Sequence, residues 1–182
     1  MLALRSAGRA YDTALARHPI VVKCSSSGAI VSAADATTQL WSTNGKPYDG
    51  ARTAIIGCYG AFWFAPVMHG VTVRLWGAYA PSTAPLAVAG KTLVDMAVFF
   101  PINISAMLGF QSLSRDRSAD AAAAVRANLW PSLRAGWCVW PPITFAIYSG
   151  AVPLGYRVLA MNVCSFAWNG YMVSRFEEPA GA

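Results

Sequence analysis

The sequence predicts an all-α fold, an integral membrane bundle of four spanning helices preceded by an amphipathic helix. The chain is 55% hydrophobic and only 12% charged, which is about half the charged fraction of a typical soluble protein. Between Arg134 and Ser174 the only charge is Arg157, which divides 22 uncharged residues (135–156) from 17 more (158–174). A helix needs roughly 20 mostly apolar residues to cross the hydrocarbon core of a membrane. The composition and this long run therefore favour a membrane protein over a soluble one.

Residues 1–18 are predicted to form the amphipathic helix. Leu4 and Leu15 would lie on one face of it, and Arg5 and Arg9 on another. The segment has no unbroken apolar run, so it does not have the pattern of a secretory signal. It is typical of a mitochondrial targeting segment or of a helix that lies in the membrane interface, and the two interpretations are compatible.

The first spanning helix is predicted at about residues 19–40. It is the most polar of the set, with Lys23 near its start and Asp35 near its end. Many of its residues are Ser, Ala or Gly, including Gly28, and such small residues let another helix approach closely. We therefore expect this helix to face protein rather than lipid, and we expect a turn at residues 44–47.

The second span is predicted at residues 53–73, which carry no charge. Gly57, Ala61 and Ala65 recur every four residues and would form a small-residue stripe for helix packing. His69 is the one histidine in this span.

The third span is predicted at residues 96–114, after a loop at 80–85. Lys91 and Asp95 precede it and are spaced to pair as i and i+4 on a helix. Residues 115–134 are the most polar segment, and they predict a helix along the surface that ends at the Trp-Pro break.

The last span is expected within residues 135–174, and it can be bent into two helices. Four aromatic residues near its ends are predicted to anchor it at the membrane interfaces: Trp137, Trp140, Trp168 and Tyr171. Residues 19–174 would thus form one transmembrane domain, and 175–182 a soluble tail. Lys and Arg divide evenly between the two sides, so the sequence predicts no orientation.

Catalytic, metal-binding and nucleic-acid-binding functions are not predicted. The chain has no phosphate-binding Gly loop, no HExxH and no nucleophile elbow. Its net charge of +6 is not gathered in a basic cluster interleaved with aromatic residues. The four cysteines lack CxxC spacing, and we expect them to be buried apolar residues rather than metal ligands or a disulfide. We therefore expect no enzyme activity, no metal and no cofactor.

Seven short motifs occur in an order and at a spacing that are similar to a known family. They are Tyr11, Leu15 and Pro19; Asp35 and Gln39; Asp49 and Arg52; Pro66 and His69; Lys91, Asp95 and Pro101; Trp137, Trp140 and Pro141; and Pro153, Arg157, Trp168, Asn169, Tyr171 and Ser174. The pattern resembles that of the Mpv-seventeen / 22-kDa peroxisomal membrane protein family, small multi-span proteins of mitochondrial inner and peroxisomal membranes. The resemblance covers nearly the whole chain. Met96, Thr144 and Ile147 replace polar residues of the family pattern.

The resemblance implies a weakly selective pore or metabolite pathway in the mitochondrial inner membrane. Ionisable groups within spans are costly and usually line a polar path or pair with one another. Six residues are candidates for pore lining or for intramembrane pairing: Asp35, Gln39, His69, Lys91, Asp95 and Arg157. In the pairing interpretation, Asp35 or Asp95 would neutralise Arg157, or Lys91 would pair with Asp95.

An alternative function is that of a non-conducting accessory subunit of a large inner-membrane assembly, such as a respiratory complex or ATP synthase. The replacement of polar residues of the family pattern by Met96, Thr144 and Ile147 motivates it, because smaller or less polar replacements suit a sealed bundle. The expected partners are membrane lipid, with bound lipid such as cardiolipin, and subunits of a larger complex or further copies of the chain. The Arg-rich start favours the mitochondrial inner membrane over the peroxisomal membrane.

Overall fold

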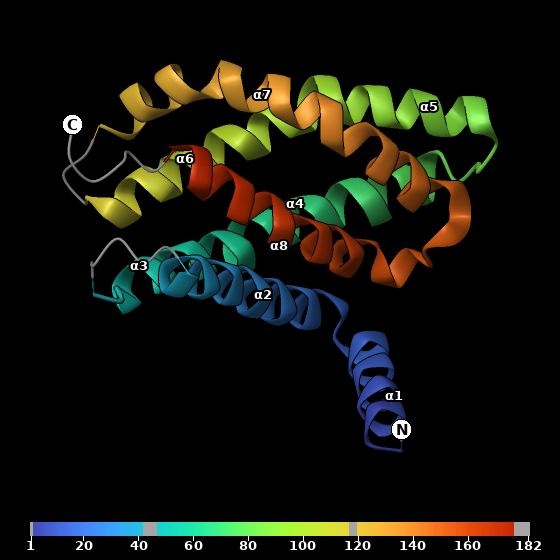
Figure 1. Cartoon of the computed structure of the whole chain (residues 1–182). Helices are drawn as coiled ribbons and strands as arrows, with labels where there is room; N and C mark the ends of the chain where they lie inside the picture. The colour runs from blue at the N-terminus through green and yellow to red at the C-terminus, as the bar shows by residue number, and fades with distance from the viewer. Residues whose placement is uncertain (1, 42–46, 117–119, 177–182) are drawn as a thin grey trace.

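The computed structural model describes residues 2–41, 47–116 and 120–176, and their regular structure is entirely helical. The helices join into six continuous rods (Figure 1). In chain order they are α1 (Leu2–Arg17); α2 (Pro19–Trp41); α3 (Gly50–Cys58), η1 (Tyr59–Phe64), α4 (Ala65–His69) and η2 (Gly70–Tyr79); α5 (Pro85–Val94), η3 (Asp95–Phe99) and α6 (Phe100–Arg115); α7 (Ala121–Ala146) and η4 (Ile147–Ala151); and η5 (Leu154–Tyr156) and α8 (Arg157–Phe176).

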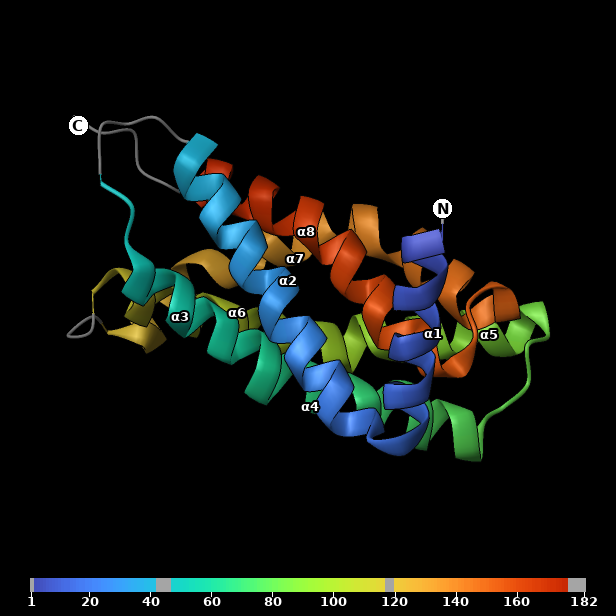
Figure 2. The same ribbon diagram turned by 90° about the horizontal axis from the view of Figure 1, so that it is seen from below.

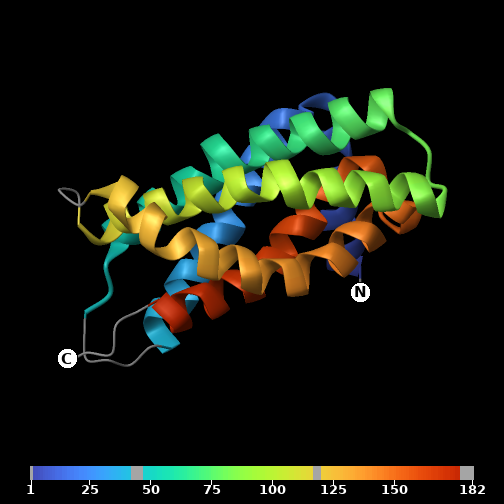
Figure 3. The ribbon, with the colours of Figure 1, turned by 90° about the horizontal axis from the view of Figure 1, so that it is seen from above.

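The rods from α2 to α8 run roughly along one axis, and each reverses the direction of the one before (Figure 1). The α5–α6 rod lies beside α7, as Figure 3 shows from above. On the other side of the bundle, α2 packs against both α8 and α3. Two clusters of buried apolar side chains fill the space between the rods.

Helix α1 projects from the bundle (Figure 1) and crosses the direction of the other helices at a steep angle (Figure 2). The ring of Tyr11 packs on that of Tyr156, with the centroids 5.9 Å apart, and Leu15 is buried, while Arg9 and Arg17 are exposed. In the described part of this helix, Tyr11 and Leu15 thus contact the bundle, while Arg9 and Arg17 lie on the exposed surface.

The bundle has two distinct ends. At one end the turn after η4 meets the loop before α5, because a Cβ added at Gly150 would lie 3.4 Å from the Thr83 side chain. Helix α1 contacts the same end through Tyr156. The opposite end holds the start of α3, the end of α6 and the start of α7 (Figure 1).

Two of the described helical rods are long and apolar enough to cross a membrane, Gly50–Tyr79 with 30 residues and Pro85–Arg115 with 31. They contain the predicted spans 53–73 and 96–114. The predicted count of four spans is not confirmed by length and composition. The predicted turn at 44–47 and the tail at 175–182 lie mostly outside the described residues.

The last predicted span is divided into two antiparallel rods. Gly150 has φ of 97°, a left-handed conformation that favours glycine, and it breaks the helix inside η4, one residue before that segment ends. The prediction of a separate surface helix that ends at Trp130 was wrong, because α7 continues through Pro131. Leu133, Gly136 and Trp140 are buried in the bundle, and this packing offsets the hydrogen bond that Pro131 removes.

Segments η1 and η3 are wide π-helical turns that end just before Pro66 and Pro101. Proline lacks an N–H and clashes with the carbonyl four residues earlier, so a wider turn before it relieves the clash. In η3, Phe100 N–H bonds to Asp95 O. The next carbonyl, that of Met96, would need an N–H from Pro101. Instead the Trp137 indole donates to Met96 O at 3.1 Å.

Small residues bring α2 and the α3–η1 rod into close contact. A Cβ added at Gly60 would lie 2.9 Å from Ser27 O, and one at Gly28 would lie 3.1 Å from Ala61 Cβ. A Cβ at Gly57 would collide with the Ser32 hydroxyl. Ala65 continues the same stripe and is fully buried. The predicted stripe therefore lies at a helix–helix contact.

Two of the four predicted interface anchors lie in the core. Trp140 and Trp168 are only 8% and 6% exposed, and their rings contact each other edge to face. They cannot anchor the surface, because their rings pack inside the bundle; Trp137 and Tyr171 are 39% and 41% exposed. The cysteines also differ from the expectation of burial, since Cys58 and Cys138 are exposed.

Candidate functional site

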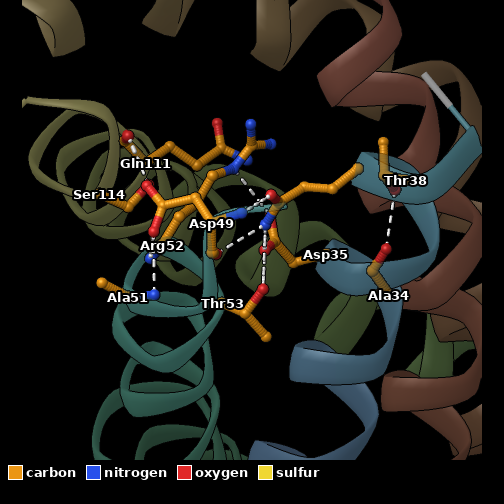
Figure 4. A network of polar contacts seen from close by, with 10 residues as sticks. Ala34, Asp35, Thr38, Asp49, Ala51, Arg52, Thr53, Gln111 and Ser114 are labelled. Atoms are coloured by element: carbon orange, nitrogen blue, oxygen red, sulfur yellow. Dashed lines mark hydrogen bonds and ion pairs between the residues drawn. The ribbon is translucent and has the colours of Figure 1, made fainter. Parts of the chain in front are cut away.

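A polar cluster joins α2 to the start of α3 (Figure 4). Asp35 Oδ1 accepts a hydrogen bond from Arg52 Nε at 3.0 Å, and the two side chains are 4% and 15% exposed. Asp35 Oδ2 accepts from Gln39 Nε2 and from Thr53 Oγ1, each at 2.7 Å. With Asp49, these residues form what we call the Asp35 cluster. Its buried carboxylate is fully hydrogen-bonded, as a buried charge requires.

Asp49 sets the position of this cluster by capping α3. Its carboxylate accepts from the backbone N–H of Ala51 at 2.9 Å and of Arg52 at 3.0 Å, which satisfies two orphan donors of the first helical turn. Gln39 fastens the cap to α2, because its Nε2 donates to Asp49 O at 3.1 Å and its Oε1 accepts from Asp49 N at 2.8 Å.

A second polar cluster lies deeper toward the other end of the bundle. Asp95 Oδ1 accepts from the Trp76 indole at 2.9 Å, and Asp95 Oδ2 accepts from the Tyr148 hydroxyl. The Arg157 guanidinium carbon lies 5.5 Å from the centroid of the Tyr148 ring, a cation–π contact. We call these four residues the Asp95 cluster. Three of them come from π-helical segments, Trp76 from η2, Asp95 from η3 and Tyr148 from η4.

The other candidate charges have different partners from those predicted. Lys91 Nζ donates to Ser82 O at 2.6 Å, and among the described residues neither Lys91 nor Arg157 forms an ion pair with Asp95. His69 has a partner on another helix, because its Nδ1 lies 3.0 Å from Nζ of Lys23 in α2. The predicted pairing of Lys91 with Asp95 is therefore wrong, since the Lys91 side chain turns to the loop before α5.

A cavity of about 60 Å³ lies between the two clusters, in the centre of the bundle. Residues of α2, η1, α4, η3, α6, α7 and α8 line it. Four of its lining side chains hold a buried polar atom with no partner in the described structure: Asn103 Oδ1, Trp140 Nε1, Asn162 Nδ2 and Trp168 Nε1. A buried polar group without a partner costs about 1–3 kcal/mol. Water or a solute that reached these groups would therefore be stabilised by them.

A smaller cavity of about 10 Å³ lies between the central cavity and the Asp35 cluster. Asp35 and Arg52 line it. Four residues line both cavities: Val31, Tyr59, Met107 and Asn169. Asp95 lines the central cavity. The two cavities thus form a line from the Asp35 cluster to the Asp95 cluster, interrupted by the shared residues.

Of the six predicted polar candidates, the structure brings Asp35 and Gln39 together at one end, and Asp95 and Arg157 near each other in the Asp95 cluster. Lys91 and His69 line neither cavity. Sequence reasoning missed Thr53, Trp76 and Tyr148 as cluster members, and the unpaired groups of the central cavity: Asn103, Trp140, Asn162 and Trp168. The polar residues within apolar runs were the available signal for Asn103 and Asn162.

The described residues bring together no group of three His, Cys, Asp or Glu side chains that could hold a metal ion.

Comparisons with known proteins find relatives along most of the chain. Residues 112–173 match the model of the Mpv17 / PMP22 family. Protein SYM1 of Saccharomyces cerevisiae is 31% identical over 89% of this chain and 86% of its own length. Peroxisomal membrane protein 2 of Bos taurus is 28% identical, over 90% of this chain and 86% of its own. Mitochondrial inner membrane protein Mpv17 of Caenorhabditis briggsae is 28% identical over 94% of both chains. No solved structure matches.

Proposed function

The chain belongs to the Mpv17 / PMP22 family, and from that premise we propose that it spans a membrane and conducts small polar solutes through its bundle. The observation that carries the proposal is the line of two cavities, which share four lining residues and lead from the Asp35 cluster to Asp95. A sealed packing bundle gains nothing from unpaired polar atoms around a central cavity, whereas a solute path needs them.

In the membrane, we assign the four predicted spans to α2, Gly50–Tyr79, Pro85–Arg115 and the hairpin of α7–η4 with α8. Helix α1 would then lie in the interface, with its basic surface toward lipid headgroups. Each arm of the hairpin has at least 20 residues, which at about 1.5 Å per residue is enough to cross a hydrocarbon core of about 30 Å. We therefore propose that the fourth predicted span is in fact two crossings, one by α7–η4 and one by α8.

The mitochondrial inner membrane is the proposed location. The Arg-rich start of the chain supports it, and so does the similarity to a protein named for that membrane. The similarity to a peroxisomal membrane protein makes the peroxisome the alternative. None of the relatives named above is called a subunit of a larger complex, so the accessory-subunit function comes second.

The conduction proposal can be tested by blocking the central cavity. Ser165 lines it and is 8% exposed, whereas Ser105 lines a groove on the outer surface of α6. Single-cysteine variants at these positions, in a chain freed of its own four cysteines, would be placed in liposomes and treated with a small neutral thiol reagent. We expect the reagent to reduce solute efflux for Ser165→Cys and not for Ser105→Cys.

The conduction proposal is contradicted if liposomes that contain the folded, monodisperse protein release solute no faster than protein-free liposomes. That result would remove the proposed function.

A further inference from the structure

Among the side chains that line the central cavity, more hydrogen-bond donors than acceptors lack a partner. Trp140, Asn162 and Trp168 each present an N–H without a partner, against one unpaired carbonyl oxygen on Asn103. All four side chains are at least nine-tenths buried, with 8%, 0%, 6% and 8% exposed in that order. Asn162 Oδ1 accepts from Ser27 Oγ at 3.0 Å, and in this amide orientation its N–H₂ group has no partner. The cavity therefore favours a solute that brings oxygen acceptors.

The charges around the cavity disfavour an ion. Asp95 is the one Asp, Glu, Lys, Arg or His among the lining residues, and its two oxygens already accept from Trp76 and Tyr148. A cation would meet a single carboxylate, each of whose oxygens already accepts a hydrogen bond, and N–H donors that repel it. An anion would meet the carboxylate and no Lys or Arg. Either ion would lose its hydration shell and find no side chain of opposite charge free to replace it, which is costly in an apolar site.

The size of the cavity limits the solute. One water needs about 10–15 Å³ of such space, so a cavity of about 60 Å³ holds about four waters or a solute of similar size. Aromatic and methionine side chains make up much of its wall, among them Phe100, Met107 and Met161. Such walls suit the carbon skeleton of a small polyol better than a hydrated ion.

We propose that this cavity is a binding site for small uncharged solutes that carry hydroxyl or carbonyl oxygens, held by the indole N–H groups of Trp140 and Trp168 and by the Asn162 amide. This inference rests on the proposed conduction function and names the class of solute that the path prefers.

The test uses proteoliposomes, with glycerol as the uncharged probe and potassium chloride as the charged one. Trp140→Phe and Trp168→Phe each remove one N–H and keep an aromatic ring. We expect each to lower glycerol permeability by about 3- to 10-fold, as the loss of one hydrogen bond predicts. The matched control is Trp63→Phe, because the Trp63 indole N–H is also unpaired but Trp63 lines the outer groove and not the cavity. Its glycerol permeability should equal that of the unmodified chain.

Ser165→Ala gives a second, milder variant if a tryptophan variant fails to fold, and it should lower glycerol permeability as well. Unchanged glycerol permeability in folded Trp140→Phe, Trp168→Phe and Ser165→Ala variants would overturn the binding site. Potassium or chloride currents that fall as much as the glycerol flux in the same variants would overturn the preference for uncharged solutes, and conduction itself would stand. If the folded protein passes neither glycerol nor potassium chloride, both the proposed function and this inference are wrong.

Discussion

Two arginines of this chain form ion pairs that differ in burial. Arg52 binds Asp35 in a buried pair, while Arg126 lies 3.6 Å from Asp120 with both side chains more than half exposed. Removing one partner of a buried pair leaves an uncompensated charge and costs about 3–5 kcal/mol. An exposed pair contributes only about 0–1 kcal/mol.

We therefore expect Arg52→Ala to destabilise the protein strongly and Arg126→Ala to change little. Thermal unfolding of the two variants in detergent is the measurement. Equal shifts in Tm would mean that the Asp35 cluster does not hold α2 to α3.

Met107 is one of the four residues that lie between the two cavities. It lines both, and its side chain is 5% exposed. Its neighbour Leu108 is 4% exposed and lines neither. Truncating either residue to Ala should destabilise the core by about 2–5 kcal/mol.

Only Met107→Ala should also join the cavities and raise solute flux, because Leu108→Ala removes similar volume away from the path. Flux from proteoliposomes with matched protein content is the measurement. A rise for both variants would indicate general loosening of the bundle instead of an opened path.

At the scale of the helices, the contact of α2 with α3–η1 depends on glycine. A Cβ at Gly60 would lie 2.9 Å from the backbone oxygen of Ser27, which cannot move without moving α2, whereas a Cβ at Gly109 would meet nothing within 4 Å. Gly60→Ala should therefore cost about 1–3 kcal/mol through overpacking. Gly109→Ala should stabilise α6 by about 0.5–1 kcal/mol. Denaturation in mixed micelles distinguishes the two, and a neutral Gly60→Ala would contradict the close packing of these rods.

Pro101 and Trp137 form a coupled pair across two helices. The Trp137 indole satisfies the Met96 carbonyl that Pro101 leaves without a donor. Replacing Pro101 by Ala supplies that donor within the rod. Trp137→Phe should then cost about 0.5–1.5 kcal/mol in the natural background and less when Pro101→Ala is present. A double-mutant cycle measures this coupling. Strict additivity of the two free-energy changes would show that the Trp137 indole does not compensate for the donor that Pro101 lacks.

The elements also show where sequence reasoning succeeds and fails. Uncharged runs predicted the rods at 53–73 and 96–114, because apolar length is a local property. The Asp95 cluster could not be predicted, since Asp95 lies 19 and 53 residues from its partners Trp76 and Tyr148. Those side chains meet through the π-helical turns, which change the face on which each residue lies. A prediction based on regular α-helical periodicity therefore places these residues on the wrong faces.

The buried position of Trp140 and Trp168 has a similar cause at the scale of the whole molecule. Position near the end of an apolar run predicts an interface residue only if the helix faces lipid there. Both residues instead turn toward Phe100 at the centre of the bundle, with ring centroids 6.3 and 6.5 Å away. Which face of each rod turns inward depends on how all the rods pack. The sequence alone contains the composition and the order of the motifs. These predicted the family and the all-α class, but they do not contain the inward face of each rod.

The alternating direction of the rods makes a definite prediction about the two sides of the membrane. Helix α1, the loop at Thr83 and the turn at Leu154 lie at one end of the bundle, because Tyr11 contacts Tyr156 and Gly150 faces Thr83. The starts of α3 and α7 lie at the other end (Figure 1), and Tyr48 and Asp120 come just before these two helices. In a chain freed of its own cysteines, single cysteines would be labelled with a membrane-impermeant maleimide in sealed vesicles.

We expect Gly8→Cys, Thr83→Cys and Leu154→Cys to react from one side, and Tyr48→Cys and Asp120→Cys from the other. The Gly8 position suits a label, since nothing lies within 4 Å of an added Cβ. Labelling of Leu154→Cys from the side of Asp120→Cys would show that α7–η4 does not cross, and that the last apolar stretch re-enters the side from which it came. In that case the path between the two clusters could not run from one side of the membrane to the other, so this labelling decides whether the bundle axis is also the axis of conduction.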